Sequence, residues 1–195
     1  MVQSGPAPLR LFIAIPLPRA INLELDHLQY QLAATLPHGA MRWVRPESRH
    51  LTLRFLDAVP NLTAQALTAV VNRVAMKSTP FALPLTCLGA FPSPYRTRVL
   101  WLGLDDHSGQ CLALKQRLER ELTGLGLIPE KQRFTPHLTL ARARGNKKVE
   151  GINWQLKPQP LSLEVGQIQL MASRLTPGGA HYDCLHQSRF GKGVN

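Results

Sequence analysis

The sequence predicts an α+β fold built from antiparallel sheets, and three observations support this prediction. Stretches with a strand pattern outnumber helical stretches, and most of them follow one another closely enough to pair as hairpins. Near the end of the chain, the turn signal Pro177-Gly178-Gly179 separates two alternating runs. Two segments also repeat one order of elements: an apolar strand, a helix, a polar loop and a strand that opens with His-Leu-Thr-Leu.

The first half of the chain predicts two helices and four strands. The run 9–17 is apolar and closes at prolines, which indicates a buried strand. Apolar residues recur at helical spacing through 19–36 and again through 63–77, where Thr63 is the expected N-cap. The other strands expected here are 41–44, 50–56 and 80–88.

The second half predicts one more helix among strands. We expect a loop at 89–97 between prolines and glycine, and a helix that Ser108 caps and that runs to about residue 122. A basic, irregular loop is expected at 145–157, and 161–175 alternates as one long strand or a bent pair. The other strands expected here are 98–104, 137–141 and 181–190.

The length fits one domain with a full core, or one domain made of two similar lobes. At 195 residues the chain is long enough for either arrangement. We therefore treat residues 1–195 as a single domain, with a loose N-terminal arm at 1–8 and a loose end at 191–195.

The repeated tetrapeptide motif His-Leu-Thr-Leu occurs at residues 50–53 and 137–140. In a strand, side chains alternate between two faces, so each motif places its leucines on one face and its His and Thr on the other. The leucines of each motif are then expected to enter a core. If the two strands face each other, His50, Thr52, His137 and Thr139 would meet around one small ligand.

Two histidines and two hydroxyls suit phosphoryl transfer without a metal. A neutral imidazole takes a proton from the attacking oxygen, and a protonated one gives a proton to the departing oxygen. Threonine hydroxyls donate to the non-bridging oxygens, where negative charge accumulates. A 2′,3′-cyclic phosphate fits this set, because its ring already holds the leaving oxygen in place.

The charge balance favours a polyanionic partner such as nucleic acid. The chain has 23 Lys and Arg against 12 Asp and Glu, which gives a formal net charge of +11. The alternative is simply a basic surface. Basic residues cluster near both motifs: Arg42, Arg45, Arg49 and Arg54 at the first, and Lys131, Arg133, Arg142 and Arg144 at the second.

Neither a disulfide framework nor a membrane span is expected. Three cysteines without paired spacing fit a reducing compartment, so we predict a cytoplasmic protein. The apolar run that ends at Pro16 is too short for a signal peptide or a span. Nothing in the sequence demands more than a monomer.

A zinc site is the competing interpretation of the same histidines. It requires three or four ligands that include a carboxylate or thiolate. The sequence contains neither HExxH nor CxxC, and no acidic cluster lies near either His-Leu-Thr-Leu motif. We therefore expect no metal and no other cofactor.

Three stretches of this chain resemble the RNA 2′,3′-cyclic phosphodiesterases, also called 2′-5′ RNA ligases, within the two-histidine phosphoesterases. They are Arg-Leu-Phe-Ile-Ala-Ile-Pro from residue 10, His-Leu-Thr-Leu-Arg-Phe-Leu from residue 50, and Phe-Thr-Pro-His-Leu-Thr-Leu-Ala-Arg from residue 134. The closing segment 170–182, with Ser173, Gly179 and Tyr182, is also similar to the family's last hairpin.

The resemblance implies a bilobal, pseudo-symmetric fold in which two antiparallel sheets line a central groove and the helices lie outside. It implies that His50 is the proton donor, that His137 is the proton acceptor that activates water, and that Thr52 and Thr139 hold the phosphate. It also places Arg133 and Phe134 where they would bind a base or phosphate. The expected product is a 2′-phosphomonoester, and the reverse reaction would join 2′-5′ ends without ATP. Asp57, at the turn expected after the first motif, departs from the glycine usual in the family.

Three functional hypotheses follow. The first is an enzyme that hydrolyses 2′,3′-cyclic phosphates on RNA ends or small nucleotides. The second is an RNA- or nucleotide-binding module without turnover, although a binder has no need of both His and Thr twice. The third is a sibling activity in the same groove, the hydrolysis of 2′-5′ linkages or of ADP-ribose cyclic phosphate.

Overall fold

The computed structural model of the chain describes residues 10–56, 64–145, 149–176 and 179–191. Its strands form two antiparallel sheets, one of four strands in the order β3-β1-β8-β9 and one of five in the order β2-β6-β5-β4-β7. The elements are β1 (Arg10–Pro16), α1 (Arg19–Thr35), β2 (Met41–Trp43), β3 (His50–Leu56), α2 (Ala64–Met76), β4 (Phe81–Phe91), β5 (Val99–Leu104), α3 (Gln110–Thr123), β6 (His137–Ala143), β7 (Ser162–Val165), β8 (Gln167–Thr176) and β9 (Gly179–Arg189). The α+β class with antiparallel sheets is confirmed.

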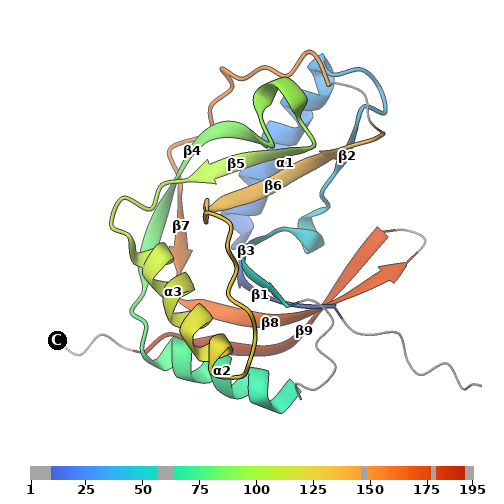
Figure 1. Cartoon of the computed structure of the whole chain (residues 1–195). Coiled ribbons are helices and arrows are strands. Elements are labelled where there is room, and N and C mark those ends of the chain that lie inside the picture. Colours follow the sequence, from blue (N-terminus) through green and yellow to red (C-terminus); the bar gives the residue numbers. More distant parts are fainter. Residues whose placement is uncertain (1–9, 57–63, 146–148, 177–178, 192–195) are drawn as a thin grey trace, which may run out of the picture.

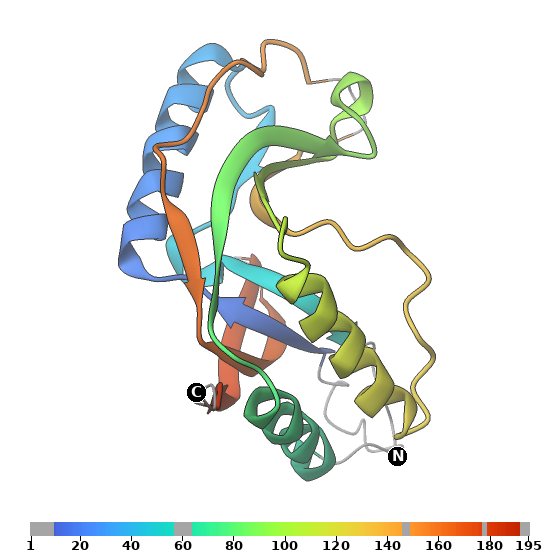
Figure 2. The same cartoon turned by 90° about the vertical axis from the view of Figure 1, so that its left-hand side faces the viewer.

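The two sheets form two lobes with the helices on their outer sides (Figure 1). Helix α1 lies behind the five-stranded sheet, while α2 and α3 lie side by side at the four-stranded lobe (Figure 1). The view in Figure 2 shows β4 as a long, bent strand that leads from α2 into the other lobe. The chain thus crosses between lobes several times, and the two lobes are not separate along the sequence.

Amphipathic helices close the core on both lobes. Helix α1 buries Ile21, Leu25, Leu28 and Leu32, which recur at spacings of three and four residues. Helix α2 does the same with Leu67, Val70, Val71 and Val74, all with no exposed surface. The helical stripes predicted from the sequence are therefore the faces that pack on the sheets.

The predicted repeat is present as two matching units, β1–α1–β3 and β5–α3–β6. In each unit the motif strand pairs antiparallel with the strand that precedes the helix. The register places His50 opposite Pro16 and His137 opposite Gly103. The repeat of elements in the sequence is therefore a repeat of strand pairing.

A β-bulge falls at the same place in both units. In β3 the register shifts so that Thr52 pairs with Ala14 and Arg54 with Ile13, which leaves Leu53 as the extra residue. In β6 the shift leaves Leu140 extra. Leu53 and Leu140 are each the fourth residue of the His-Leu-Thr-Leu motif, and both are buried. A bulge increases the local twist and re-aims the side chains that follow it.

The expected cap of the third helix is wrong. Ser108 donates to the side chain of Gln110, and the residue before the helix is Gly109 in a left-handed conformation, with φ of 70°. The carboxylate of Asp106 accepts the free amides of Cys111 and Leu112 at 2.9 and 2.8 Å. Asp106 caps this helix because the turn at Gly109 brings the carboxylate over its first turn.

Several strand boundaries also differ from the prediction, as at β6, which continues two residues beyond the predicted 137–141, to Ala143. Strand β4 continues to Phe91, three residues into the segment 89–97 expected as a loop, because Gly89 and Ala90 keep pairing with β5. The run 161–175 is two strands, as the bent-pair alternative allowed, and they belong to different sheets: β7 pairs with β4, and β8 pairs with β1 and β9. The chain changes sheets at Gly166, whose carbonyl accepts the amide of Phe190 at 2.8 Å.

Several expectations concern residues outside the described ranges. They are the arm at 1–8, Asp57, the Thr63 cap, the turn residues Pro177 and Gly178, and most of the end at 191–195. The strands on either side of that turn do pair, with Thr176 opposite Gly179. Of the helices in the described ranges, none has the length and apolar character to cross a membrane.

Candidate active site

A cavity of about 380 Å³ lies where the two motif strands approach each other. Strand β3 contributes Thr52 to its wall, and β6 contributes His137, Thr139 and Arg142. The segment before β6 contributes the rest of one side, including Arg133 and Phe134. The two motifs, 87 residues apart in the sequence (137 − 50), therefore face one space.

The His137 ring is fixed in one orientation. Its Nδ1 donates to the backbone carbonyl of Thr135 at 2.7 Å. Because a carbonyl oxygen only accepts, Nδ1 carries the proton and the neutral ring keeps a lone pair on Nε2. The ring also packs edge-on against Phe91, with centroids 4.9 Å apart, and lies 5.9 Å from Trp101. His137 is thus held as a potential proton acceptor.

His50 occupies a deeper and more aromatic position, and it is not among the residues that line the cavity. Its ring lies 4.7 Å from Phe12 and 5.3 Å edge-on from Tyr182, measured between centroids. It hydrogen-bonds to the backbone of Ser48, two residues earlier, as His137 does to Thr135. The two imidazoles are thus held by the same local device.

Burial lowers the pKa of both histidines. Desolvation is the largest cause for each, and it lowers the pKa of His50 to about 4. The backbone hydrogen bonds oppose the shift, and the positive charge of Arg142 adds to it at both rings. A protonated His137 also lowers the pKa of His50, so the two groups influence each other across the site.

Both motif threonines lie on the cavity wall. Thr52 and Thr139 are half-buried, and the leucines on either side of each are fully buried. This is the period-two separation expected from the sequence: the leucines anchor the strand, and the hydroxyls stay open.

Arg133 and Phe134 also line the cavity. Arg133 is exposed, and Phe134 is half-buried with the Nζ of Lys115 5.8 Å from its ring centroid. The segment that carries them is tied down by its neighbour Glu130, whose carboxylate pairs with Lys115 of α3 and with Arg54 of β3.

Sequence reasoning did not single out Arg142. It ends the stretch from residue 134 that resembles the family and is one of several basic residues near the second motif, but no role was assigned to it. In the structure its charge acts on both histidines. It follows the bulge in β6 and pairs in register with Arg42 and Val99. The signal that would have found it is its place five residues after His137, but the bulge that sets its direction is not visible in the sequence.

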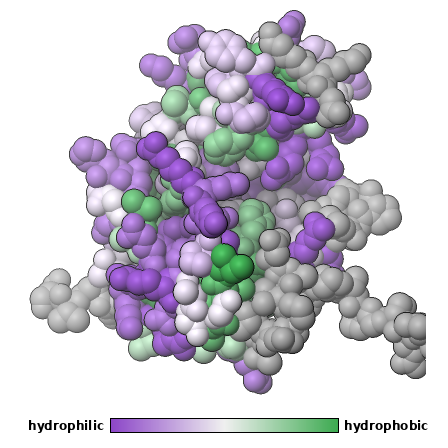
Figure 3. Space-filling model, viewed as in Figure 1, coloured by the Kyte–Doolittle hydropathy of each residue, from purple (hydrophilic) through white to green (hydrophobic). Residues whose placement is uncertain are grey.

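Exposed arginines lie close to the second motif strand. On the face drawn in Figure 3, hydrophilic side chains predominate among the coloured atoms, and hydrophobic ones form smaller groups between them. Arg42, Arg133, Arg142 and Arg144 are all exposed near the second motif strand. Among the described side chains, no group of three His, Cys, Asp or Glu residues is placed to hold a metal ion.

Comparison with known proteins shows the family of this chain. The model of the 2′-5′ RNA ligase superfamily matches residues 17–176. The chain is 35% identical over 151 residues to an RNA 2′,3′-cyclic phosphodiesterase of Aeropyrum pernix, covering 75% of this chain and 85% of that protein. It is 30% identical over 173 residues to the RNA 2′,3′-cyclic phosphodiesterase of Escherichia coli K12, covering 87% and 94%.

Solved structures agree with the sequence comparison. A Thermus thermophilus protein superposes with a TM-score of 0.81 at 26% identity, over 95% of this chain and all of that one. Escherichia coli LigT complexed with 3′-AMP gives a TM-score of 0.73 at 28% identity, over 94% and 99% of the two chains. The chain therefore belongs to the 2′-5′ RNA ligase superfamily.

Proposed function

We propose that this chain is an RNA 2′,3′-cyclic phosphodiesterase in which His137 is the general base and His50 the general acid. The relatives reported above, from Aeropyrum pernix and Escherichia coli, are RNA 2′,3′-cyclic phosphodiesterases, and Escherichia coli LigT has been crystallised with 3′-AMP. The observation that carries the proposal is that the two motif strands, from different sheets, face one cavity. Each His ring is held by the backbone two residues earlier.

In the proposed reaction, water attacks the phosphorus of the cyclic phosphate. Nε2 of His137 accepts a proton from that water as the new P–O bond forms. The bond between phosphorus and O3′ breaks on the opposite side, and protonated His50 gives its proton to the departing O3′. The product is a 2′-phosphomonoester with a free 3′-hydroxyl. A 5′-hydroxyl in place of water would join the ends by a 2′-5′ linkage without ATP.

Thr52 and Thr139 donate to the non-bridging oxygens in this scheme, and Arg142 supplies positive charge beside them. The lowered pKa of both histidines is consistent with a site that awaits an anion. A bound phosphate offsets the charge of Arg142 and raises the pKa of both rings, so that one of them is protonated nearer to neutral pH. The site then holds one protonated and one neutral imidazole only when substrate is bound.

The decisive experiment is hydrolysis of a 2′,3′-cyclic mononucleotide by the purified chain in EDTA. Phosphorus NMR should find the phosphate on the 2′ oxygen. His50→Ala and His137→Ala should each remove most of the turnover, about 10²–10⁴-fold for loss of a general acid or base, while nucleotide binding persists. Unchanged rates in both variants would refute the two-histidine mechanism.

Two other outcomes separate the competing hypotheses. Full loss of activity in EDTA would favour a metal enzyme instead. Tight nucleotide binding without any product would favour a binding module. The monomeric state and the cytoplasmic location of this chain stay predictions. Sedimentation of the purified protein tests the oligomeric state.

A further inference from the structure

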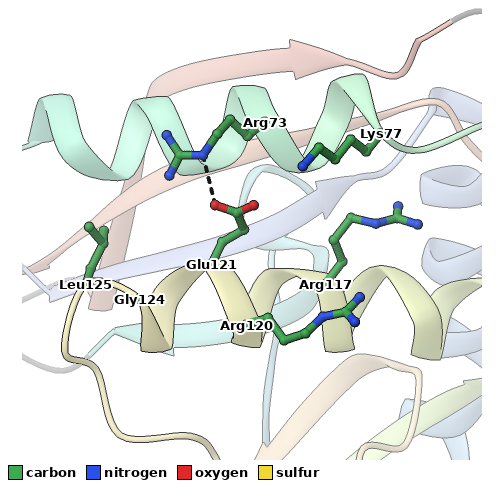
Figure 4. A pocket seen from close by; sticks show the side chains of 7 residues that line it. All are labelled: Arg73, Lys77, Arg117, Arg120, Glu121, Gly124 and Leu125. Carbon is green, nitrogen blue, oxygen red and sulfur yellow. Dashed lines mark hydrogen bonds and ion pairs between the residues drawn. The ribbon is translucent and has the colours of Figure 1, made fainter.

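A second cationic hollow lies between α2 and α3, apart from the cavity described above. It encloses about 470 Å³ and is lined by Arg73 and Lys77 from the α2 side and by Arg117, Arg120 and Glu121 of α3. Figure 4 shows Arg73 and Lys77 reaching down from one helix while Arg117 and Glu121 rise from the other. Four cations thus share this hollow with one carboxylate.

Most of that positive charge has no carboxylate partner among the described residues. Arg73 pairs with Glu121 at 2.8 Å. For Lys77, Arg117 and Arg120, no carboxylate lies within 4.0 Å in the part of the chain that the structure describes. Unpaired cations gathered in a hollow attract an anion whose oxygens can take their donors.

One of the arginines is held in place by a buried hydroxyl. The side chain of Arg117 donates from Nη1 to Oγ of Ser78 at 2.7 Å, and that Oγ donates to the carbonyl of Val74 at 2.7 Å. Ser78 is 6% exposed. The guanidinium is thus oriented toward the hollow by a neutral partner that leaves its charge available.

Helix dipoles do not account for the cluster. A cation is favoured in the last turn of a helix, which explains Arg73 on α2 and Arg120 on α3. It does not explain Arg117, which lies earlier in α3, or Lys77, which follows the end of α2. The spacing does place Arg73 and Lys77 one turn apart, and Arg117, Arg120 and Glu121 on one side of α3.

The hollow is on the other side of α3 from the residues that contact the active-site wall. Lys115 and Glu119 of α3 pair with Glu130 and Arg54, which both line the active-site cavity. Arg117 and Arg120 line the hollow instead. A helix with its side chains is about 10–12 Å across, so a few nucleotides of a polynucleotide span this distance.

From this placement we propose that the α2–α3 hollow binds the phosphodiester backbone of an RNA substrate upstream of the end that enters the active site. The inference rests on the proposed function and extends it, because it makes an RNA chain a better substrate than a cyclic mononucleotide. Arginine guanidinium groups match phosphate oxygens as paired donors, and the contacts would carry no base preference.

The test separates this site from the catalytic one. In Lys77→Gln/Arg120→Gln, both altered residues are exposed and have no partner among the described residues, so folding is preserved. Binding of a labelled single-stranded RNA of about 12 nucleotides with a 3′-hydroxyl end is measured by fluorescence anisotropy across salt concentrations. Two lost phosphate contacts should lower the slope of log K against log salt by about 1.4.

The matched control is Arg19→Gln/Lys157→Gln, which removes the same charge at exposed positions outside the hollow. Its salt slope should stay close to that of the unaltered chain. Equal losses in the two double variants would overturn the proposal, because only net charge would then matter. An unchanged slope in the Lys77/Arg120 variant would overturn it as well.

Kinetics give an independent readout. The Lys77/Arg120 variant should keep its kcat/KM for a cyclic mononucleotide and lose kcat/KM for an oligonucleotide with a 2′,3′-cyclic end. Equal effects on both substrates would refute the backbone site. If the unaltered chain turns over neither substrate, the proposed function fails, while the anisotropy measurement still decides the hollow.

Discussion

Arg49, the residue before His50, donates from Nη2 to Oε1 of Gln29 at 2.7 Å, and that amide connects the two motif strands. Nε2 of Gln29 donates to the carbonyl of Leu140 in the second motif at 2.9 Å and to that of Val44 at 3.0 Å. The Arg49 side chain is 1% exposed and also pairs with Asp26 at 2.7 Å. One amide on α1 therefore joins the strand that carries His50 to the strand that carries His137.

Replacing Gln29 by leucine should loosen this connection. Two backbone carbonyls and one guanidinium lose a partner in a part-buried place, which costs about 1–3 kcal/mol of unfolding free energy. Because the two motif strands would shift relative to each other, we expect kcat to fall more than KM rises. Thermal unfolding and steady-state kinetics measure the two effects. Gln31→Leu, at an exposed position of α1, is the control, and an equal loss in both variants would contradict the connection.

The buried His50 should make the protein less stable as the pH falls from 6.5 to about 4. In the unfolded chain the ring takes up a proton near pH 6.5, whereas in the folded chain it stays neutral down to about pH 4. The unfolded state then binds more protons, so the free energy of unfolding falls over this window by up to about 3 kcal/mol. Urea unfolding at several pH values measures the slope. His50→Gln should flatten it, and an equally steep slope in that variant would assign the effect to other groups.

The pH dependence of catalysis should differ between the free enzyme and its complex. The profile of kcat/KM reports the free protein, where both histidine pKa values are lowered, so its maximum should lie below pH 6.5. The profile of kcat reports the complex, in which the bound phosphate raises both pKa values, so its maximum should lie at higher pH. Two superimposed profiles, or a single limb, would argue against paired imidazoles beside a bound anion.

The sequence predicts the strands of this site well, because their signals are local. Leucines at alternate positions fix which face of β3 and β6 is buried, and the predicted bounds of β3 match the observed His50–Leu56. The bulges at Leu53 and Leu140 were not predicted, since they depend on the register against a distant strand. For the same reason the sequence did not reveal that Arg142 acts on both histidines.

The ion pairs under the segment before β6 give a further prediction. Glu119 lies between Lys115 at 2.7 Å and Arg54 at 3.3 Å, and the Lys115 side chain is 6% exposed. Glu119→Gln would leave two cations facing each other with less compensation, which should cost about 2–4 kcal/mol of unfolding free energy. Nucleotide KM should rise, because Glu130 and the wall of the cavity are held through the same network.

A surface pair on the same helix serves as the control for this change. Glu121 faces Arg73, whose side chain is 47% exposed, so Glu121→Gln should cost no more than about 1 kcal/mol. It should leave nucleotide KM unchanged. Equal destabilisation by the two substitutions would show that the network around Glu119 has no special role.

Gly89 in β4 lies directly against the ring of Trp101, and the last prediction concerns this contact. A Cβ added there would lie 2.1 Å from the Trp101 side chain, which packs against Phe91 and His137. Gly89→Ala must therefore displace the indole that packs against the His137 ring, at a cost of about 1–3 kcal/mol in unfolding free energy and with a lower kcat. Gly166→Ala is the control, since its Cβ would meet no atom within 4 Å. Adding Trp101→Leu to Gly89→Ala should recover part of the lost stability, because the clash disappears. If Gly89→Ala alone left both stability and kcat unchanged, the indole would not be what positions the His137 ring.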